Sequence, residues 1–227
     1  MGRVLYVINP NASQAVTDGI AGALAPLHGP VPIRCLTLAE GPPAIETDAD
    51  IAAVAAPLTR RAAALAEDAA GLVIACFSDP GVPALRAAAA CPVVGIGTAA
   101  YLQAVALAPP FGVISILPAS IPRHADAIAA LGLSRHCAGD RALGLGVAEL
   151  ADRARALPRL IDTAAQLRAD GARCLILGCA GMAWARAPLA AASRLPVIDP
   201  CQAGTALALS QIALGLAPVQ QESAHAR

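Results

Sequence analysis

Short apolar runs recur along the chain, and each ends in turn residues that precede a segment with helical spacing. The clearest run is Leu72 to Ala75, which is followed by Cys76, Phe77, Ser78 and then Asp-Pro-Gly. An apolar run of this length that ends in turn residues is typical of a buried parallel strand leading into a helix. Cys76 is therefore predicted at the carboxyl end of a strand, where open α/β sheets bind ligands. The nearby helix N-terminus is expected to lower the pKa of this thiol.

The same alternation extends over the whole chain. It predicts strands at 3–8, 31–38, 72–75, 92–96, 111–117, 134–137, 173–178 and 196–198. Helices are expected between them, at 14–27, 48–68, 82–90, 99–107, 118–131 and 149–170, the last interrupted near Pro158. Two more helices are expected, one that begins at about 182 and a final one that follows the strand at 196–198 and ends at 216. Residues 139–146 are glycine-rich and predicted as a loop, and the polar tail after Pro218 is expected to fray. Strands that alternate with helices indicate an α/β protein with parallel sheets covered on both faces.

The pattern also repeats. Cys179 ends a second strand run 103 residues after Cys76, Pro196 follows Pro92 by 104 residues, and Pro118 follows Pro10 by 108. Three matches at nearly one offset predict two similar halves that each contribute a cysteine. We expect residues 1–97 with 206–227 to form the first half and residues 98–205 the second. No linker separates the halves, so they should pack closely.

Composition excludes several classes of function. The net charge is zero, which gives no electrostatic footprint for nucleic acid or an anionic membrane. No apolar stretch reaches the roughly 20 residues of a membrane span, and the first residues lack a signal-peptide pattern, so a cytoplasmic protein is expected. The chain contains no lysine, which excludes Schiff-base chemistry, including that of pyridoxal phosphate, and a Walker phosphate loop. With no Cys-x-x-Cys and four scattered histidines, no metal site is expected.

Two cysteines at equivalent strand ends suit one reaction type. Across a cleft between the halves, one thiolate can remove a proton from a carbon acid while the opposite thiol returns one to the other face. Turn N–H groups would stabilise the carbanion, and Gly178 and Gly181 would let the backbone approach the ligand closely. Such an inversion of configuration requires no cofactor. The alternative is that Cys76 and Cys179 are inert structural thiols, as we expect of the other five cysteines, namely Cys35, Cys91, Cys137, Cys174 and Cys201.

Four motifs carry a family resemblance, in order and over essentially the whole chain: Ile8-Asn-Pro-Asn-Ala-Ser13, Ala75-Cys-Phe-Ser-Asp-Pro-Gly81, Val93-Val-Gly-Ile-Gly97 and Leu177-Gly-Cys-Ala-Gly-Met182. They resemble the aspartate/glutamate/hydantoin racemase superfamily, most closely its hydantoin racemase branch. The resemblance implies two pseudosymmetric flavodoxin-like domains with the active site between them, cofactor-independent racemisation of a small hydantoin-like molecule, and a homo-oligomer. By motif position, Cys76 and Cys179 match the catalytic cysteines. The expected substrate-binding residues are Asn9, Ser78, Asp79, Gly97, Thr98, Gly178, Ala180 and Gly181.

The branches of this superfamily differ at identifiable positions. Amino-acid racemases tend to have Asn-Thr after the first cysteine and Thr-His after the second, where this chain has Phe-Ser and Ala-Gly. Arylmalonate decarboxylases keep only the second cysteine. Hydantoin and allantoin racemases often have a glutamate where this chain has Thr98. A racemase of allantoin or of another activated carbon acid or amino acid is therefore an alternative, and a non-catalytic ligand-binding protein is a second. Glu46 and Asp79 are more typical of loop-capping carboxylates than of catalysts, and Ser78 suits a helix cap and an oxyanion donor equally.

Overall fold

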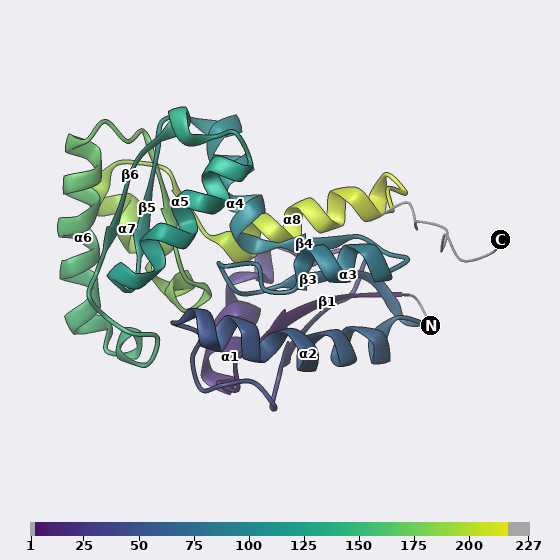
Figure 1. The fold of residues 1–227 in the computed structure, drawn as a ribbon. Helices are drawn as coiled ribbons and strands as arrows, with labels where there is room; N and C mark the ends of the chain where they lie inside the picture. The colour runs from purple at the N-terminus through teal and green to yellow at the C-terminus, as the bar shows by residue number, and fades with distance from the viewer. Residues whose placement is uncertain (1–2, 218–227) are drawn as a thin grey trace.

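The computed structural model describes residues 3–217 and contains two four-stranded parallel sheets, one in each half of the molecule (Figure 1). The frayed tail expected after Pro218 lies outside the described residues. The first sheet has the order β2-β1-β3-β4 and the second has the order β6-β5-β7-β8, so the two halves share one topology. The strands are β1 (Val4–Asn9), β2 (Ile33–Thr37), β3 (Ala69–Ile74), β4 (Val93–Gly95), β5 (Phe111–Ser115), β6 (Cys137–Ala142), β7 (Cys174–Leu177) and β8 (Val197–Ile198).

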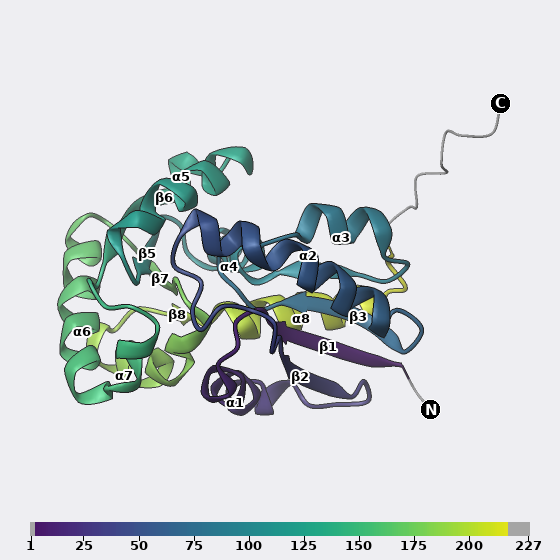
Figure 2. The same ribbon diagram turned by 60° about the horizontal axis from the view of Figure 1, so that its bottom comes forward.

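Helices connect the strands and cover both faces of each sheet (Figures 1 and 2). The α-helices are α1 (Gln14–Ala23), α2 (Asp48–Leu65), α3 (Val82–Ala88), α4 (Ile96–Leu107), α5 (Ile121–Ala130), α6 (Arg153–Ala169), α7 (Arg186–Ser193) and α8 (Pro200–Ala213). Short 3-10 helices at Pro118–Ser120, Ala148–Ala151 and Ala180–Ala185 precede α5, α6 and α7. The prediction of two α/β halves with parallel sheets is confirmed.

The two halves exchange a helix. After β4, α4 crosses to the second half and packs against β7, while α8 leaves β8 and packs against β3 and β4 of the first sheet. The two helices also contact each other, and their residues share one core with both sheets, including Val73, Tyr101 and Ile176. The predicted domain limits, 97/98 and 205/206, fall inside α4 and α8, and they stay a prediction. The shared core means that neither half buries its inner face alone.

Each sheet separates that shared core from an outer one. Along β1, Leu5 and Val7 point into the shared core, and Tyr6 and Ile8 point to the opposite face beneath α2 and α3. This is the period-two alternation of a strand whose two faces are both buried. In the second half the outer core lies under α6 and α7. The result is two sheets held in a fixed relation, with their carboxyl ends directed at a common boundary.

Three sequence expectations were wrong. The strand is predicted at 134–137, but β6 begins only at Cys137. It continues to Ala142, through part of the segment 139–146 that is predicted as a loop. Gly139 pairs with Gly112 of β5, so the ladder compensates for a sequence with little strand character. Pro158 does not interrupt α6 either, because Ala156, Leu160 and Leu167 anchor one continuous buried face.

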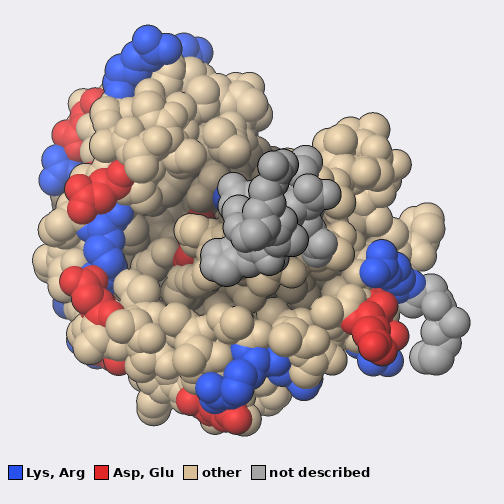
Figure 3. All heavy atoms as spheres, turned by 45° about the vertical axis from the view of Figure 1, so that its right-hand side comes forward, with Lys and Arg blue, Asp and Glu red and all other residues tan. Residues whose placement is uncertain are grey.

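The surface matches the balanced charge of the sequence. On the face seen in Figure 3, arginine and acidic side chains alternate around the periphery, and neither sign forms a large area. No helix within residues 3–217 is long and apolar enough to cross a membrane.

Candidate active site

Cys76 and Cys179 occupy equivalent places in the two halves. Cys76 comes two residues after the last residue of β3, and Cys179 comes two residues after the last residue of β7. These strands hold the same position in their sheets. Both cysteines line one pocket between the halves, and its remaining cavity volume is about 40 Å³. The pocket is lined by Asn11, Val16, Ile45, Glu46, Ala75, Cys76, Phe77, Ser78, Ile116, Ser120, Arg123, His124, Val147, Gly178, Cys179, Ala180 and Gly181.

The two sulfurs also have equivalent hydrogen-bond donors. The N–H of Gly181 donates to Sγ of Cys179 over 3.4 Å, and the N–H of Ser78 faces the sulfur of Cys76 in the same way. Burial nevertheless raises the pKa of Cys76 to about 12, with a further contribution from Cys179. Burial likewise raises the pKa of Cys179 to about 11. The expected lowering by a helix N-terminus is therefore wrong, because loss of solvation outweighs the N–H donors.

Asp79 shapes the loop that carries Cys76. Its carboxylate accepts the N–H groups of Gly97 and Thr98 at 2.8 and 2.7 Å, so it caps the first turn of α4. A Cβ on Gly97 would lie 2.1 Å from the carbonyl oxygen of Phe77, so only glycine permits this approach. The turn predicted at Gly97 and Thr98 is thus the start of a helix. Asp79, Gly97 and Thr98 do not line the pocket, and their predicted contact with substrate stays untested.

The second cysteine loop is held close to β5. A Cβ on Gly178 would lie 2.7 Å from the carbonyl oxygen of Ile114, which explains the glycine before the cysteine. Ala180 and Gly181 follow in the first turn of a 3-10 helix and line the pocket. The structure therefore brings together six predicted site residues, namely Cys76, Ser78, Gly178, Cys179, Ala180 and Gly181.

From the sequence, Asn9 is expected to bind substrate, but it is the neighbouring Asn11 that lines the pocket. Asn9 is buried, and its Nδ2 donates to Oδ1 of Asn11 at 2.9 Å and to Oγ1 of Thr17 at 3.1 Å. Asn11 lines the pocket instead. Its Oδ1 accepts from Asn9 and from the N–H of Ser13, and its Nδ2 donates to none of the residues at 3–217. Asn9 positions Asn11 as a donor, and its direct substrate contact stays a prediction. Ser13 is the N-cap of α1, as expected.

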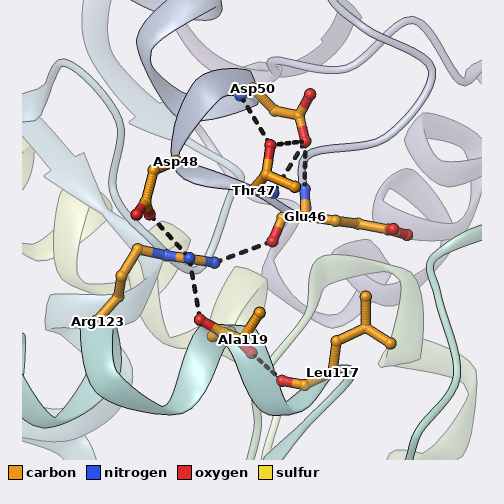
Figure 4. A network of polar contacts seen from close by, with 8 residues as sticks. Glu46, Thr47, Asp48, Asp50, Leu117, Ala119 and Arg123 are labelled. Carbon is orange, nitrogen blue, oxygen red and sulfur yellow. Dashed lines mark hydrogen bonds and ion pairs between the residues drawn. The ribbon is translucent and has the colours of Figure 1, made fainter.

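A polar network joins the two halves beside the pocket, and Figure 4 shows the part of it around Arg123. Arg123 of α5 donates to Asp48 at 2.9 Å and to the carbonyl oxygen of Glu46 at 3.2 Å, both in the segment that enters α2. The Glu46 carboxylate accepts the N–H of Val147 at 2.8 Å from the opposite half. The expected loop-capping role of Glu46 is thus carried out across the domain boundary. Because Ile45 and Glu46 line the pocket, this network fixes one of its walls.

Sequence reasoning missed the contribution of α5. Arg123 and His124 both line the pocket, and Ile116 and Ser120 line it just before the helix. His124 is buried and its Nδ1 lies 2.8 Å from a carboxylate oxygen of Asp140. The repeat offered a signal, because Pro118 matches Pro10 and places the start of α5 at the same sheet edge as Asn11.

A second cavity adjoins the pocket and has a volume of about 710 Å³. The two share Val16, Val147, Ala180 and Gly181 as lining residues. Small residues of α1, among them Gly19 and Gly22, form part of its lining, as does Trp184. Within residues 3–217, no three His, Cys, Asp or Glu side chains are grouped so that they could hold a metal ion.

Known proteins are similar to this chain in sequence and in fold. The family model described as Asp/Glu/Hydantoin racemase matches residues 5–208. The chain is 34% identical over 217 residues to a hydantoin racemase of Rhizobium meliloti, covering 94% of this chain and 90% of the relative. It is 33% identical to an allantoin racemase of Klebsiella pneumoniae, with a TM-score of 0.87 and coverage of 96% and 91%. An allantoin racemase of Pseudomonas fluorescens superposes with a TM-score of 0.89 at 28% identity, covering 95% and 93%.

These matches confirm the resemblance read from the four motifs, and they cover both cysteine loops and the pocket between the halves. They also decide between an enzyme and a non-catalytic binding protein. The chain belongs to the Asp/Glu/Hydantoin racemase family and is a racemase.

Proposed function

We propose that this racemase inverts C5 of 5-substituted hydantoins by moving protons between Cys76 and Cys179, without a cofactor. One observation carries the proposal: the two thiols lie at equivalent strand ends, line the same pocket, and each faces the N–H two residues further along. Opposed acid and base groups of the same kind are what a reversible inversion requires. The same two residues can then act on either enantiomer, with the roles of acid and base exchanged.

The steps balance without any other reactant. The thiolate of one cysteine forms an S–H bond with the C5 proton, and the electron pair of the broken C–H bond delocalises onto the adjacent carbonyl oxygen. The other cysteine then gives its proton to the opposite face of C5 and becomes the thiolate. Donors near the enolate lower the barrier because charge develops there. Nδ2 of Asn11 and the N–H of Phe77 are candidates, since neither donates to a group within residues 3–217.

The second cavity supports a substrate with a substituent at C5. The reaction pocket is small, whereas the adjoining cavity of about 710 Å³ shares four lining residues with it. The ring would bind between the cysteines, and the substituent would extend past Val16 and Val147. Because these side chains and those of Leu150 and Trp184 are largely apolar, an apolar substituent fits best.

Allantoin is the second candidate, because two similar solved structures are allantoin racemases. Its substituent is polar and would need hydrogen-bond partners in the second cavity, where Arg153 is the available charged side chain. A comparison of kcat/KM for 5-benzylhydantoin and allantoin separates the two. A larger value for allantoin would move the assignment to the polar substrate while leaving the reaction type unchanged.

The test of the reaction is deuterium exchange at C5 of a single enantiomer of 5-benzylhydantoin in D₂O, with optical rotation followed alongside. The native protein should exchange and racemise. Cys76→Ala and Cys179→Ala should each lose racemisation, because a single base cannot deliver a proton to the opposite face. Cys35→Ala, a half-buried thiol outside the pocket, is the matched control and should keep full activity. A single pocket mutant that racemises at the native rate would refute the two-base mechanism.

We also propose that the enzyme is a cytoplasmic homo-oligomer. Its seven cysteines suit a reducing compartment, and all those within residues 3–217 are free thiols. Sedimentation of the purified protein and fractionation of the producing cells test the two statements separately.

A further inference from the structure

Three buried polar side chains form a hydrogen-bonded group beside the pocket. His124 lies on α5, Ser115 ends β5 and Asp140 lies on the neighbouring strand β6. Nδ1 of His124 is 2.8 Å from Asp140 and 3.0 Å from the Ser115 hydroxyl, which donates to the other carboxylate oxygen at 2.5 Å. The side chains of His124 and Asp140 are only 4% and 8% exposed. Such a buried carboxylate fixes the orientation of the imidazole and places a proton on Nδ1.

The ring is also held from the side of the first half. Phe77, the residue after Cys76, packs edge-on against His124 with ring centroids 4.9 Å apart and planes at 84°. Since Nδ1 is occupied, Nε2 is the polar atom of His124 left for the pocket, which the residue lines together with both cysteines. The hydrogen bonds of the His124 ring within residues 3–217 both involve Nδ1, with Ser115 and Asp140 as partners, and neither reaches a sulfur. A buried imidazole that is held through one nitrogen and has its other nitrogen at a reaction pocket is placed to accept a proton there.

The two-cysteine reaction begins only after one of the two thiols has lost its proton. It needs one thiolate and one thiol at the start, yet burial disfavours ionisation of both thiols by raising the pKa of each. A nearby group that takes up the proton when the first thiol ionises would favour this step. Imidazole is the side chain that gains and loses a proton near neutrality, and Asp140 would stabilise the resulting cation. Arg123 also lines the pocket, but its guanidinium offers only hydrogen-bond donors and no acceptor for a proton.

We propose that His124 is a further catalytic residue: its Nε2 accepts the proton of one thiol, and the resulting imidazolium donates a hydrogen bond to the carbonyl oxygen beside C5. The S–H bond breaks, an N–H bond forms and a thiolate remains. The imidazolium keeps this proton while the two cysteines exchange theirs with C5, so one histidine serves both directions. Because no hydrogen bond joins either sulfur to Nε2, a water molecule relays the proton. The cavity of about 40 Å³ has room for one water molecule.

This inference rests on the proposed function, but its main test needs no substrate. The ultraviolet absorbance of thiolate and the rate of alkylation of Cys76 and Cys179 by iodoacetamide, mapped by mass spectrometry, are measured at neutral pH. His124→Gln should remove the thiolate signal and slow alkylation of both cysteines at least about tenfold. His28→Gln, an exposed histidine outside the pocket, is the control and should change neither. Unchanged absorbance and alkylation in His124→Gln would overturn the proposal.

A second measurement covers the case in which His124→Gln does not fold. In the native protein, ¹⁵N NMR should show one imidazole protonated on both nitrogens, and this state should disappear in the Cys76→Ala/Cys179→Ala double mutant, which has no thiol proton to give. A fully protonated ring in that mutant would refute the coupling. For racemisation, His124→Gln should lower kcat about 10²–10⁴-fold. Native protein that shows the coupled pair but does not racemise hydantoins would refute the substrate and leave the role of His124 standing.

Discussion

At the scale of single residues, two carboxylates near the pocket, those of Asp79 and Glu46, stabilise backbone rather than perform chemistry. Asp79 accepts two N–H groups from the start of α4, and Glu46 accepts one from Val147 across the boundary between the halves. Burial raises the pKa of Asp79, although the N–H groups of Thr98 and Gly97 act in the opposite direction. The chemistry is thereby left to the two sulfurs and the imidazole that line the pocket.

Replacing Asp79 tests this structural role. In Asp79→Ala, the N–H groups of Gly97 and Thr98 lose their acceptor, and an alanine must adopt the positive φ of 49° found at this position. We expect the free energy of unfolding to fall by about 1–3 kcal/mol in a urea titration. Asp79→Asn keeps an acceptor oxygen and tolerates this φ, so it should lose less. Equal stability of Asp79→Ala and the native protein would show that the cap is dispensable.

At the scale of elements, the two glycines in α1 could be replaced by alanine without a clash, whereas the glycine in α4 could not. A Cβ on Gly19 would meet nothing within 4 Å, whereas one on Gly97 would lie 2.1 Å from the backbone oxygen of Phe77. Helix propensity alone favours alanine at both positions. Gly19 is therefore a weakness of its helix, and Gly97 is a requirement of the Cys76 loop.

Substitution by alanine at each position separates the two cases. Gly19→Ala should raise the free energy of unfolding by about 0.5–1 kcal/mol. Alanine has less conformational freedom than glycine in the unfolded chain, so less entropy is lost when the helix forms. Gly97→Ala should lower it by about 1–3 kcal/mol and reduce racemisation, since the Cys76 loop must move away. Urea titrations and initial rates measure both effects. The same sign of stability change in the two variants would contradict the explanation.

Sequence patterns predicted those strands whose apolar residues are buried on both faces. They did not predict elements that form because of pairing with a neighbouring strand or packing against distant residues. The runs before Cys76 and Cys179 are strongly apolar, so β3, β7 and the cysteine positions were predictable. β6 is a half-exposed edge strand, and its pairing with β5 is visible only in three dimensions. His124 and Arg123 were missed for a related reason. Their partners, Asp140 and Glu46, lie 16 and 77 residues away along the chain. Nothing local marks such pairs.

At the scale of the whole molecule, the cysteines give the fold a common dependence on pH. Burial raises the pKa of all seven thiols, to about 11 in Cys174 and well above the ordinary value in Cys201. Cys174 and Cys201 lie in the core that joins the two halves. Ionising either thiol would place a charge where α4, α8 and both sheets meet. The contact between the halves should therefore be the part of the fold most sensitive to alkaline pH.

This predicts a loss of stability at alkaline pH. A thiol whose pKa is higher in the folded protein than in the unfolded chain binds its proton more tightly when folded. Its contribution is complete below the unfolded pKa of about 8.5 and is lost as the pH rises through the folded value, about 11 for Cys174. Within that window each buried thiol lowers the free energy of unfolding by up to about 1.4 kcal/mol per pH unit.

Urea titrations in reducing buffer between about pH 8 and pH 10 measure the slope. Cys174→Ala, which removes one core thiol that is fully buried, should show a shallower slope than the native protein, even though the cavity it creates lowers its stability at pH 8. Cys35→Ala removes a half-buried thiol outside the shared core and should change the slope less. If the native slope is flat and Cys174→Ala matches it, then the core thiols ionise without opening the contact between the halves. In that case the shared core is more permeable to water than its burial indicates.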